Sequence, residues 1–538
     1  MGSRLARYAR TLRHVRPSQI AGRLWAEGRR AAGLVRAPAA PEGVAGALRP
    51  RSAFVHHDPW NTPGAVADGR FTFLDETRDL GRPVDWEPSA PLLWRFNLHY
   101  LQPLALLDRD AAHALVRDWR RANPPGTPVA WHPYPTAMRL THALTSGHDW
   151  APDVQASLYR QAGWLARTLE TYHPGNHLIE NARALVLAGA WFAGQGEADG
   201  WTARGRAILR REVADQVLAD GAYFERSPMY HALMLHAWGD VLNATPPAHP
   251  DAAGLTLTVR AMAEALASMC HPDGQIALFN DATLEIAPPP SALLDYAGRL
   301  VGPFDRGPRD LPDAGLYRLE DADAVVLADF GVIGPDYLPA HAHADIFAFE
   351  ASFGGLRFVT DTGVSEYAGE RRAWDRGTPA HNTVSIDGRD QAEVWASFRV
   401  ARRWPPVGVE RISADGAERV RGTFHGWTAL LGDALRHRRE TILDTSARVL
   451  RIVDDVGGVG EHDIVARVHL HPEVTVTAQD GGYLLQRDGV AVRLVVRQGA
   501  ARWTRTRYSP RFGSALERDC LEVSADRAPA RLAVDLHY

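Results

Sequence analysis

Residues 338–363, LPAHAHADIFAFEASFGGLRFVTDTG, place two histidines one residue apart with a carboxylate close behind them. The histidines are His341 and His343, and the carboxylate is Asp345. An imidazole can act as a general base or as a metal ligand, and a nearby carboxylate can orient it. Alternating apolar residues follow, so we expect these side chains at the start of a β-strand.

A second carboxylate and a third histidine follow in the same part of the chain. Asp361 ends the run LRFVT, and His381 opens the run HNTVSIDG. Together with His343 they have the composition of a zinc site, because zinc is bound in proteins by imidazole, thiolate and carboxylate groups. The alternative is that these histidines are hydrogen-bonded loop residues and the aspartate is a cap.

The simplest strand register does not bring this trio together. A two-residue turn at Gly354-Gly355 pairs Ser352 with Arg357. It then leaves His343 five residues out of step with Asp361, which is roughly 17 Å along a strand. A bulge, a wider turn or pairing through a third strand would be needed to close that gap.

Another group of polar residues lies at the starts of two predicted helices. The segments are YHPGNHLIENARALVLAG and YFERSPMYHALMLHAWGD. Asn176 could simply cap its helix, and Ser227 followed by proline is a typical helix start. In a ring of helical hairpins such starts gather around one mouth, so we expect a polar cluster there. Its members would be Asn176, His177, Glu180, Glu225, Arg226, Tyr230 and His231.

Two aromatic segments add to this group. WRFNLHY contains Asn97 and His99, and WHPYPTAMRL contains Arg139. Aromatic rings beside arginine and asparagine suit a sugar that carries a carboxylate, because rings stack on the apolar face and arginine binds the acid. The alternative is that these aromatic residues belong to the helical core.

The wider pattern indicates a helical region followed by a β region. Residues 1–90 contain a basic helix and an irregular segment rich in Pro, Gly and Ala. Residues 91–305 repeat apolar positions at helical spacing between short turns, which predicts stacked antiparallel helical hairpins, a solenoid or toroid. Residues 313–538 alternate apolar and polar residues between Gly and Asp turns, which predicts an antiparallel β-sandwich.

The amino-acid composition and the N-terminal segment restrict the partners and cellular locations that we expect for the protein. The formal net charge of −4 gives no basic field for a nucleic acid. Cys270 and Cys520 are expected to be buried thiols rather than a disulfide framework. The basic, amphipathic N-terminal helix predicts a surface helix, or a helix that contacts a membrane surface or a partner protein. It lacks the apolar region of a secretory signal, so we expect a cytoplasmic protein or one exported by an unrecognised route.

Several segments resemble the heparinase II/III family of polysaccharide lyases. They are NHLIENARALVLAGAWF, SPMYHALMLHAWGDVL, HAHADIFAFEASFGGLRFVTDTGVSEY and AHNTVSIDG, and the resemblance extends from about residue 90 onward. The N-terminal TLRHVRPSQIAGRLW is similar to the start of members associated with bacterial exopolysaccharide gene clusters. The resemblance implies an incomplete α/α toroid followed by a β-sandwich, and β-elimination at a uronic acid.

The resemblance also implies residue roles. Asn176 matches the position that contacts the uronate carboxylate, Tyr230 matches the catalytic tyrosine, and His341 matches the catalytic histidine of the β domain. A structural Zn²⁺ is implied at His343, Asp361 and His381. Asp345 is expected to orient a neighbour rather than to bind the metal.

The expected ligand is an acidic polysaccharide or oligosaccharide. Arg371, Arg372 and Arg376 could hold a polyanion, or could be solvated loop charges. The modest net charge and the unrecognised export signal favour a non-sulfated bacterial exopolysaccharide that contains uronate. The residues expected to bind it are Asn97, His99, Arg139, His177, Glu180, Arg226, Arg371 and Arg376.

Two other functions remain open from the sequence. A glycoside hydrolase on the same toroid needs two carboxylates that flank the bond, and Glu180 and Glu225 are the obvious pair. A non-catalytic glycan-binding or assembly protein of exopolysaccharide biosynthesis would use the N-terminal helix as its docking element.

Overall fold

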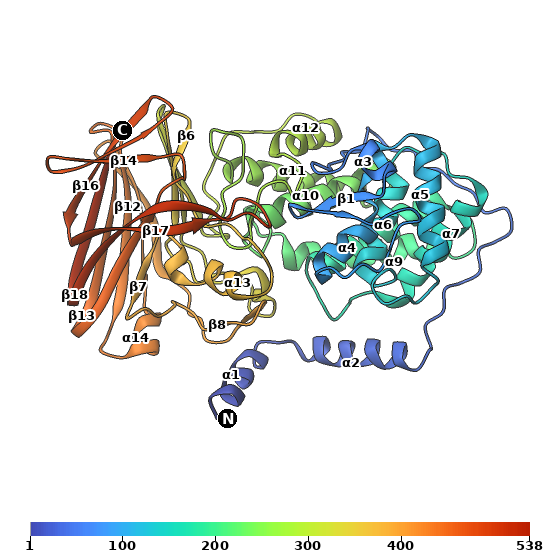
Figure 1. Ribbon diagram of the computed structural model, residues 1–538, viewed down its shortest axis with the longest axis horizontal. Coiled ribbons are helices and arrows are strands. Elements are labelled where there is room, and N and C mark those ends of the chain that lie inside the picture. Colours follow the sequence, from blue (N-terminus) through green and yellow to red (C-terminus); the bar gives the residue numbers. More distant parts are fainter. Residues whose placement is uncertain (1) are drawn as a thin grey trace.

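The computed structural model describes residues 2–538, with side chains from residue 5 onward. A helical domain and a β domain lie side by side, and helices α1 (Gly2–Leu12) and α2 (Pro17–Ala31) run along one edge of the molecule past both (Figure 1). The predicted order, an α/α helical region followed by a large antiparallel β region, is confirmed. No helix in the described part of the chain is long and apolar enough to span a membrane.

The segment between α2 and the toroid wraps the helical domain. It carries α3 (Pro63–Ala67) and the hairpin of β1 (Arg70–Phe73) and β2 (Glu76–Asp79). Phe71, Phe73 and Trp86 are buried in the same core as the helices. This segment was expected to be irregular, and its aromatic residues explain why it stays on the helical surface.

The helical domain is built around two buried helices. In α8 and α10 nearly every residue is buried, because other helices pack around both of them. Helices on the outside carry a single apolar face. The helices of the domain are α4 (Leu92–Tyr100), α5 (Arg109–Ala122), α6 (Pro133–Thr145), α7 (Pro152–Thr168), α8 (Asn176–Trp191), α9 (Ala198–Gln216), α10 (Pro228–Asn243), α11 (Ala252–Ser268) and α12 (Pro290–Val301).

Two large antiparallel sheets share one apolar core in the β domain, and β8 (Val394–Trp395) pairs with β9 (Arg399–Val400) in a small separate sheet. The smaller sheet has the order β3-β4-β5-β6, and the larger has the order β10-β11-β12-β13-β18-β16-β15-β14. Strands β7 and β17 pair with β13 and β18. The bounds are β3 (Leu316–Glu320), β4 (Ala324–Asp329), β5 (Phe349–Phe353), β6 (Leu356–Val359), β7 (Val384–Ile386), β10 (Val407–Ala414), β11 (Ala417–Phe424), β12 (Arg436–Asp444), β13 (Val449–His469), β14 (Thr475–Gln479), β15 (Gly482–Arg487), β16 (Val490–Gln498), β17 (Ala500–Tyr508) and β18 (Leu516–His537).

The hairpin of β5 and β6 follows the expected register only at its turn. Ser352 pairs with Arg357 as predicted, and a bulge then sets Ala351 opposite Val359. His341 ends the short 3₁₀ helix η2 (Pro339–His341), well before β5 begins. The expectation that the two histidines open a strand is therefore wrong, because His341 ends η2 and His343 lies in the loop that follows it.

The two helix starts differ in their caps. Ser227 caps α10, and its hydroxyl accepts a hydrogen bond from the backbone N–H of Tyr230 at 3.3 Å. In α8 the capping position is Gly175, and Asn176 is the first helical residue. A Cβ on Gly175 would lie 2.5 Å from Cδ2 of Leu338, so glycine allows the β-domain loop to approach the start of α8.

Candidate active site and metal centre

A cavity of about 390 Å³ lies where the helical and β domains meet. Residues from the starts of α8 and α10 line it together with residues from the β-domain loops. Six of the residues predicted from the sequence line this cavity: Asn97, Asn176, His177, Glu180, Tyr230 and His341. The grouping of helix starts around one mouth is thus seen in the structure.

Tyr230 and His341 face each other across the domain boundary. Their rings stack with centroids 3.8 Å apart and planes 13° apart. The phenol of Tyr230 hydrogen-bonds to the phenol of Tyr367 at 2.9 Å. Burial, reinforced by Tyr367 and Asp281, raises the pKa of Tyr230 well above its usual value. The phenol therefore carries its proton at neutral pH.

Glu225 fixes the orientation of His341. Its Oε2 lies within hydrogen-bonding distance of Nδ1 of His341, and its Oε1 accepts a hydrogen bond from the hydroxyl of Tyr223 at 3.1 Å. Glu225 is almost fully buried. A carboxylate on Nδ1 favours the tautomer that leaves Nε2 of His341 as the basic nitrogen.

His177 is held by an aromatic ring and a carboxylate. Its ring stacks on Tyr134 with centroids 4.1 Å apart, and its Nδ1 lies 3.1 Å from Oε1 of Glu170. Although burial opposes the charge, His177 and the neighbouring histidines lower the pKa of Glu170 to about 2. Asn176 lies beside this group at the cavity surface, where its amide can donate to a substrate carboxylate.

A buried ion network lies behind the cavity wall. Glu180 accepts hydrogen bonds from Arg183 at 3.1 and 3.2 Å, and the same guanidinium binds Asp240 through Nε at 3.1 Å. Asp240 also accepts a hydrogen bond from Tyr296 at 2.7 Å. Burial raises the pKa of Glu180 despite the attraction of Arg183. Glu180 is thus part of a charge-balanced cluster as well as of the cavity lining.

His99 and Arg139 lie in the helical core rather than at the cavity. Nδ1 of His99 accepts the indole N–H of Trp119 at 3.1 Å. Arg139 donates to the side chain of Gln161 at 2.7 Å and to the carbonyl of His99 at 2.9 Å, and it stacks over Trp119. Their predicted contact with substrate is not supported, because these buried donors are used within the core.

Arg226 and Arg376 also serve the protein interior. Arg226 donates to the carbonyls of Phe224 and Ala314 at 3.0 and 3.1 Å, which ties α10 to the start of the β domain. Arg376 is buried and donates to the carbonyl of Ala342 at 2.9 Å. Arg371 is half-exposed, 3.9 Å from Glu366. The buried Arg376 is therefore not placed to hold a polyanion, whereas contact through the partly buried Arg226 and through Arg371 stays a prediction.

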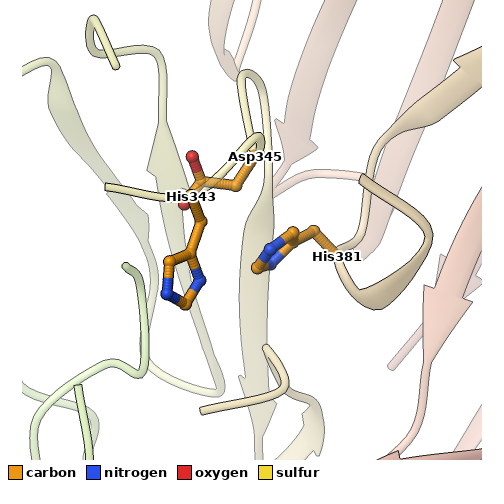
Figure 2. A group of neighbouring side chains, drawn as sticks. All are labelled: His343, Asp345 and His381. Carbon is orange, nitrogen blue, oxygen red and sulfur yellow. The ribbon is translucent and has the colours of Figure 1, made fainter. Parts of the chain in front are cut away.

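A buried His/Asp/His group lies next to the cavity. His343 and Asp345 come from one loop and His381 from another (Figure 2), and one ligand atom of each lies within 4.8 Å of the others. Nε2 of His343 donates to Asp281 at 2.7 Å, and Nδ1 of His381 donates to Asp361 at 2.7 Å.

The atoms that remain fit a metal ion. Nδ1 of His343, Oδ2 of Asp345 and Nε2 of His381 are buried and have no hydrogen-bond partner. Buried polar atoms without partners are costly unless a ligand satisfies them. Carboxylates on the far nitrogens of metal-binding histidines are a common arrangement in zinc sites.

This group differs from the predicted ligand set in one carboxylate. Asp345, which was expected to orient a neighbour, belongs to the group, whereas Asp361 holds His381 through Oδ1 and its Oδ2 is also buried without a partner. The cause is visible in the backbone, because Asp361 follows β6 while His343 lies in the loop before β5. Burial raises the pKa of Asp345, and a bound cation would oppose that effect.

The sequence did not single out several residues of the site. Tyr134 and Tyr367 line the cavity, and Asp281 binds both His343 and Arg372. Tyr134 lies in the segment WHPYPTAMRL, from which Arg139 was chosen. The proline-flanked tyrosine at the helix start was the available signal, since the start of that helix faces the same mouth.

Comparisons with known proteins agree with this architecture. The family model described as Heparinase II/III N-terminus matches residues 128–288, and the one described as Heparinase II/III-like, C-terminal matches residues 305–530. Two solved structures of heparinase III share 19% and 18% identity with this chain. They give TM-scores of 0.63 and 0.66 over 85% of this chain and 81% and 80% of theirs, which shows the fold.

Two curated relatives match this chain over only part of their own length. The heparin-sulfate lyase of Pedobacter heparinus is 25% identical over 371 residues, which are 58% of this chain and 55% of that protein. The heparin-sulfate lyase of Bacteroides stercoris is 25% identical over 330 residues, 53% of this chain and 47% of that protein. The chain thus spans about half the length of the curated relatives it matches. Because both family models match in order along most of one polypeptide, this chain belongs to the heparinase II/III family.

Proposed function

We propose that this protein is a polysaccharide lyase that cleaves a uronic-acid-containing polysaccharide by β-elimination. The observation that carries the proposal is the stacking of Tyr230 on His341 at the wall of a cavity that also contains Asn176. Two groups able to move protons and one amide donor meet there from two domains. Membership of a family whose curated relatives are heparin-sulfate lyases supports the same conclusion.

The reaction requires three tasks. A base takes the proton from C5 of the uronate, and the electrons of that bond form the C4–C5 double bond. The bond from C4 to the glycosidic oxygen breaks, and an acid protonates the departing oxygen. Hydrogen-bond donors must neutralise the carboxylate, because otherwise the negative charge that develops on it as the C5 proton leaves keeps C5 too weakly acidic to react.

The residues of the cavity suit these tasks. Asn176 would donate its amide to the uronate carboxylate. His341, with Nδ1 on Glu225, presents the basic Nε2, and Tyr230 holds a phenolic proton that it can give to the leaving oxygen. Tyr230 can also take the C5 proton once substrate contacts lower the pKa of its phenol, so Tyr230 and His341 would share the two proton transfers.

A bound Zn²⁺ would have a structural part in this proposal. His343, Asp345 and His381 would hold it, and Asp361 and Asp281 would orient the two imidazoles. The ion would supply a fixed crosslink between two loops. His341 lies two residues from His343, so that crosslink would hold His341 against Tyr230.

The lining of the cavity supports a substrate of modest charge. Of the described residues that line it, Arg183 is the single arginine, and it is held between Glu180 and Asp240. Histidine, tyrosine and asparagine side chains suit a uronate carboxylate better than clustered sulfates. We therefore propose a non-sulfated bacterial exopolysaccharide as the substrate. The exopolysaccharide-cluster subtype and the cellular location stay predictions from the sequence.

The rival functions have less support. Glu180 is bound by Arg183, and Glu225 by His341 and Tyr223, so neither carboxylate of the proposed hydrolase pair stands ready for a glycosidic oxygen. A purely glycan-binding protein would not need the stacked Tyr230–His341 pair.

Ultraviolet absorbance of the unsaturated uronate tests the proposal. The enzymes compared would be the wild type, Tyr230→Phe and the control Tyr483→Phe, which lies in β15. Each would be incubated with glucuronan, alginate, hyaluronan, heparosan and the producing organism's own exopolysaccharide. We expect a rising signal that is lost only in Tyr230→Phe. Fragments without the absorbance would indicate a hydrolase, and an intact producer polymer would indicate a binding or assembly role.

A further inference from the structure

The N-terminal helices touch the body of the protein with only one face. In α2 the inward positions recur at helical spacing: the side chain of Gln19 donates to the carbonyl of Tyr337 at 3.4 Å, and a Cβ on Gly22 would lie 3.0 Å from Cβ of Tyr172. Ala26 and Arg29 continue this line. No residue of α2 is fully buried.

The opposite face of these helices is apolar and exposed. Leu24 and Trp25 of α2 are 66% and 69% exposed, and Ile20 lies one turn before Leu24 on the same face. In α1, Leu5 and Leu12 are 70% and 51% exposed. Figure 1 shows both helices along the outer edge of the molecule, with α1 beside the β domain and α2 beside the helical domain. An apolar face of this kind is unusual on a surface that meets only water.

Basic residues border the apolar face. Residues 5–36 contain eight arginines and one glutamate, Glu27. Arg16, Arg23 and Arg30 recur every seven residues and so follow one margin of the apolar face of α2. Arg7 and Arg10 of α1 are bound to Glu393 and hold that helix to the β domain.

We propose that α1 and α2 form a docking surface for an anionic lipid bilayer, with their axes parallel to the membrane. The apolar side chains would enter the boundary between headgroups and acyl chains, with Trp25 at its edge, and Arg23 and Arg30 would meet lipid phosphates. A bilayer accepts a narrow apolar ridge without a shaped pocket, whereas a protein partner would need one. Binding would be strengthened by anionic lipid and weakened by salt.

This docking surface rests on segments that line the cavity. The guanidinium of Arg16 stacks over Tyr337 at 3.7 Å, and the next residue, Leu338, lines the cavity. Tyr8 packs on Trp395 with ring centroids 4.8 Å apart, three residues before the cavity residue Phe398. A docked protein would thus hold the cavity beside the bilayer surface. The proposal does not depend on the chemistry that the cavity performs.

Vesicle flotation with the full chain tests the proposal. Wild type would be mixed with vesicles of phosphatidylcholine alone or with added phosphatidylglycerol, at low and high salt. We expect flotation with the anionic vesicles and at least about tenfold weaker binding by Leu24→Gln/Trp25→Gln, because two apolar side chains lose their burial. Arg23→Gln/Arg30→Gln should weaken binding mainly at low salt, because high salt already screens the attraction that these arginines supply.

A matched control distinguishes binding through this surface from nonspecific binding through any exposed apolar side chain. Leu257→Gln removes an apolar side chain that is 68% exposed in α11, and it should float as wild type does. Circular dichroism and the melting temperature check that each variant folds. Absence of wild-type binding to anionic vesicles, or equal binding by Leu24→Gln/Trp25→Gln, overturns the proposal. A wild-type dimer that forms without vesicles and dissociates in this variant also overturns the proposal, because the apolar face would then bind a second copy of the chain.

Discussion

Glu225 and His341 meet across the domain boundary, with the carboxylate of one on Nδ1 of the other. Glu225 precedes α10 in the helical domain, and His341 ends η2 in the β domain. The pair therefore depends on correct docking of the two domains. It also decides which nitrogen of His341 faces the substrate, because a carboxylate on Nδ1 keeps the proton there.

Glu225→Gln should reduce kcat by about 10²- to 10⁴-fold with little change in KM. An amide can donate to Nδ1, which moves the proton of His341 to Nε2 and removes the basic nitrogen. Glu225→Asp should recover part of the loss. Initial rates of unsaturated-product formation provide the measurement, with the exposed Glu461→Gln as the control. A change in KM alone would mean that Glu225 does not orient His341.

The phenols of Tyr230 and Tyr367 should contribute unequally to kcat. Tyr230→Phe removes the proposed transferable proton and should lower kcat by about 10²- to 10⁴-fold. Tyr367→Phe removes only the hydrogen-bond partner at 2.9 Å, so we expect a smaller loss. Because burial raises the pKa of Tyr230, its proton should be retained as pH passes the ordinary tyrosine pKa of about 10. Equal losses in both variants would assign the proton transfer to the pair rather than to Tyr230.

Zinc binding should distinguish the two candidate carboxylates. Asp345→Asn should abolish tight binding, because Asp345 belongs to the His/Asp/His group whose ligand atoms lie close together. Asp361→Asn should weaken binding by about 10- to 100-fold, since Asp361 acts through His381. Competition with a chromogenic chelator measures both, and the exposed Asp415→Asn is the control. A larger loss in Asp361→Asn would restore the ligand set predicted from the sequence.

The features of the fold that the sequence predicted correctly depend on residues that are close together in the chain. The helical period of residues 91–305 and the alternation after residue 313 identified the two domains, because each pattern reflects one buried face. Ser227 was identified as a cap for the same reason, since its hydroxyl satisfies a backbone donor three residues later. The pairing of Ser352 with Arg357 followed from a two-residue glycine turn.

The features that local pattern could not describe depend on distant contacts. Arg139, Arg226 and Arg376 looked like anion-binding residues, but each donates to groups brought near only by tertiary packing. The choice between Asp345 and Asp361 depended on loop geometry that strand alternation does not describe. Tyr230 and His341 are 111 residues apart in the sequence, and resemblance to a family, rather than local pattern, suggested their shared role.

Arg183→Met should destabilise the helical domain by about 3–5 kcal/mol. The guanidinium lies between the carboxylates of Glu180 and Asp240, and its removal leaves two buried charges without a partner. Adding Asp240→Asn should recover part of the loss because it removes one of those charges. Urea unfolding monitored by circular dichroism measures the effect. Arg531→Met removes an exposed ion pair and should cost less than about 1 kcal/mol, so a similar cost in both variants would contradict the account.

Acid should release α1 from the β domain. Although burial opposes the charge, Arg10 and Arg7 lower the pKa of Glu393 to about 2 in the folded protein, against an ordinary value near 4.3. The folded-state pKa is the lower one, so the attachment is fully stabilised above the ordinary pKa and is lost as pH falls towards 2. Hydrogen exchange of residues 5–15, corrected for the intrinsic rate, should therefore accelerate between about pH 4.5 and 2.

Glu393→Gln should reproduce that release at neutral pH, because a neutral amide cannot hold two guanidinium groups as a carboxylate does. The exposed Glu461→Gln should leave exchange in residues 5–15 unchanged. Protection that persists in Glu393→Gln would show that the stacking of Tyr8 on Trp395 is sufficient to hold α1. In that case the acid-induced release should also be absent from the wild type, since the same aromatic contact does not titrate.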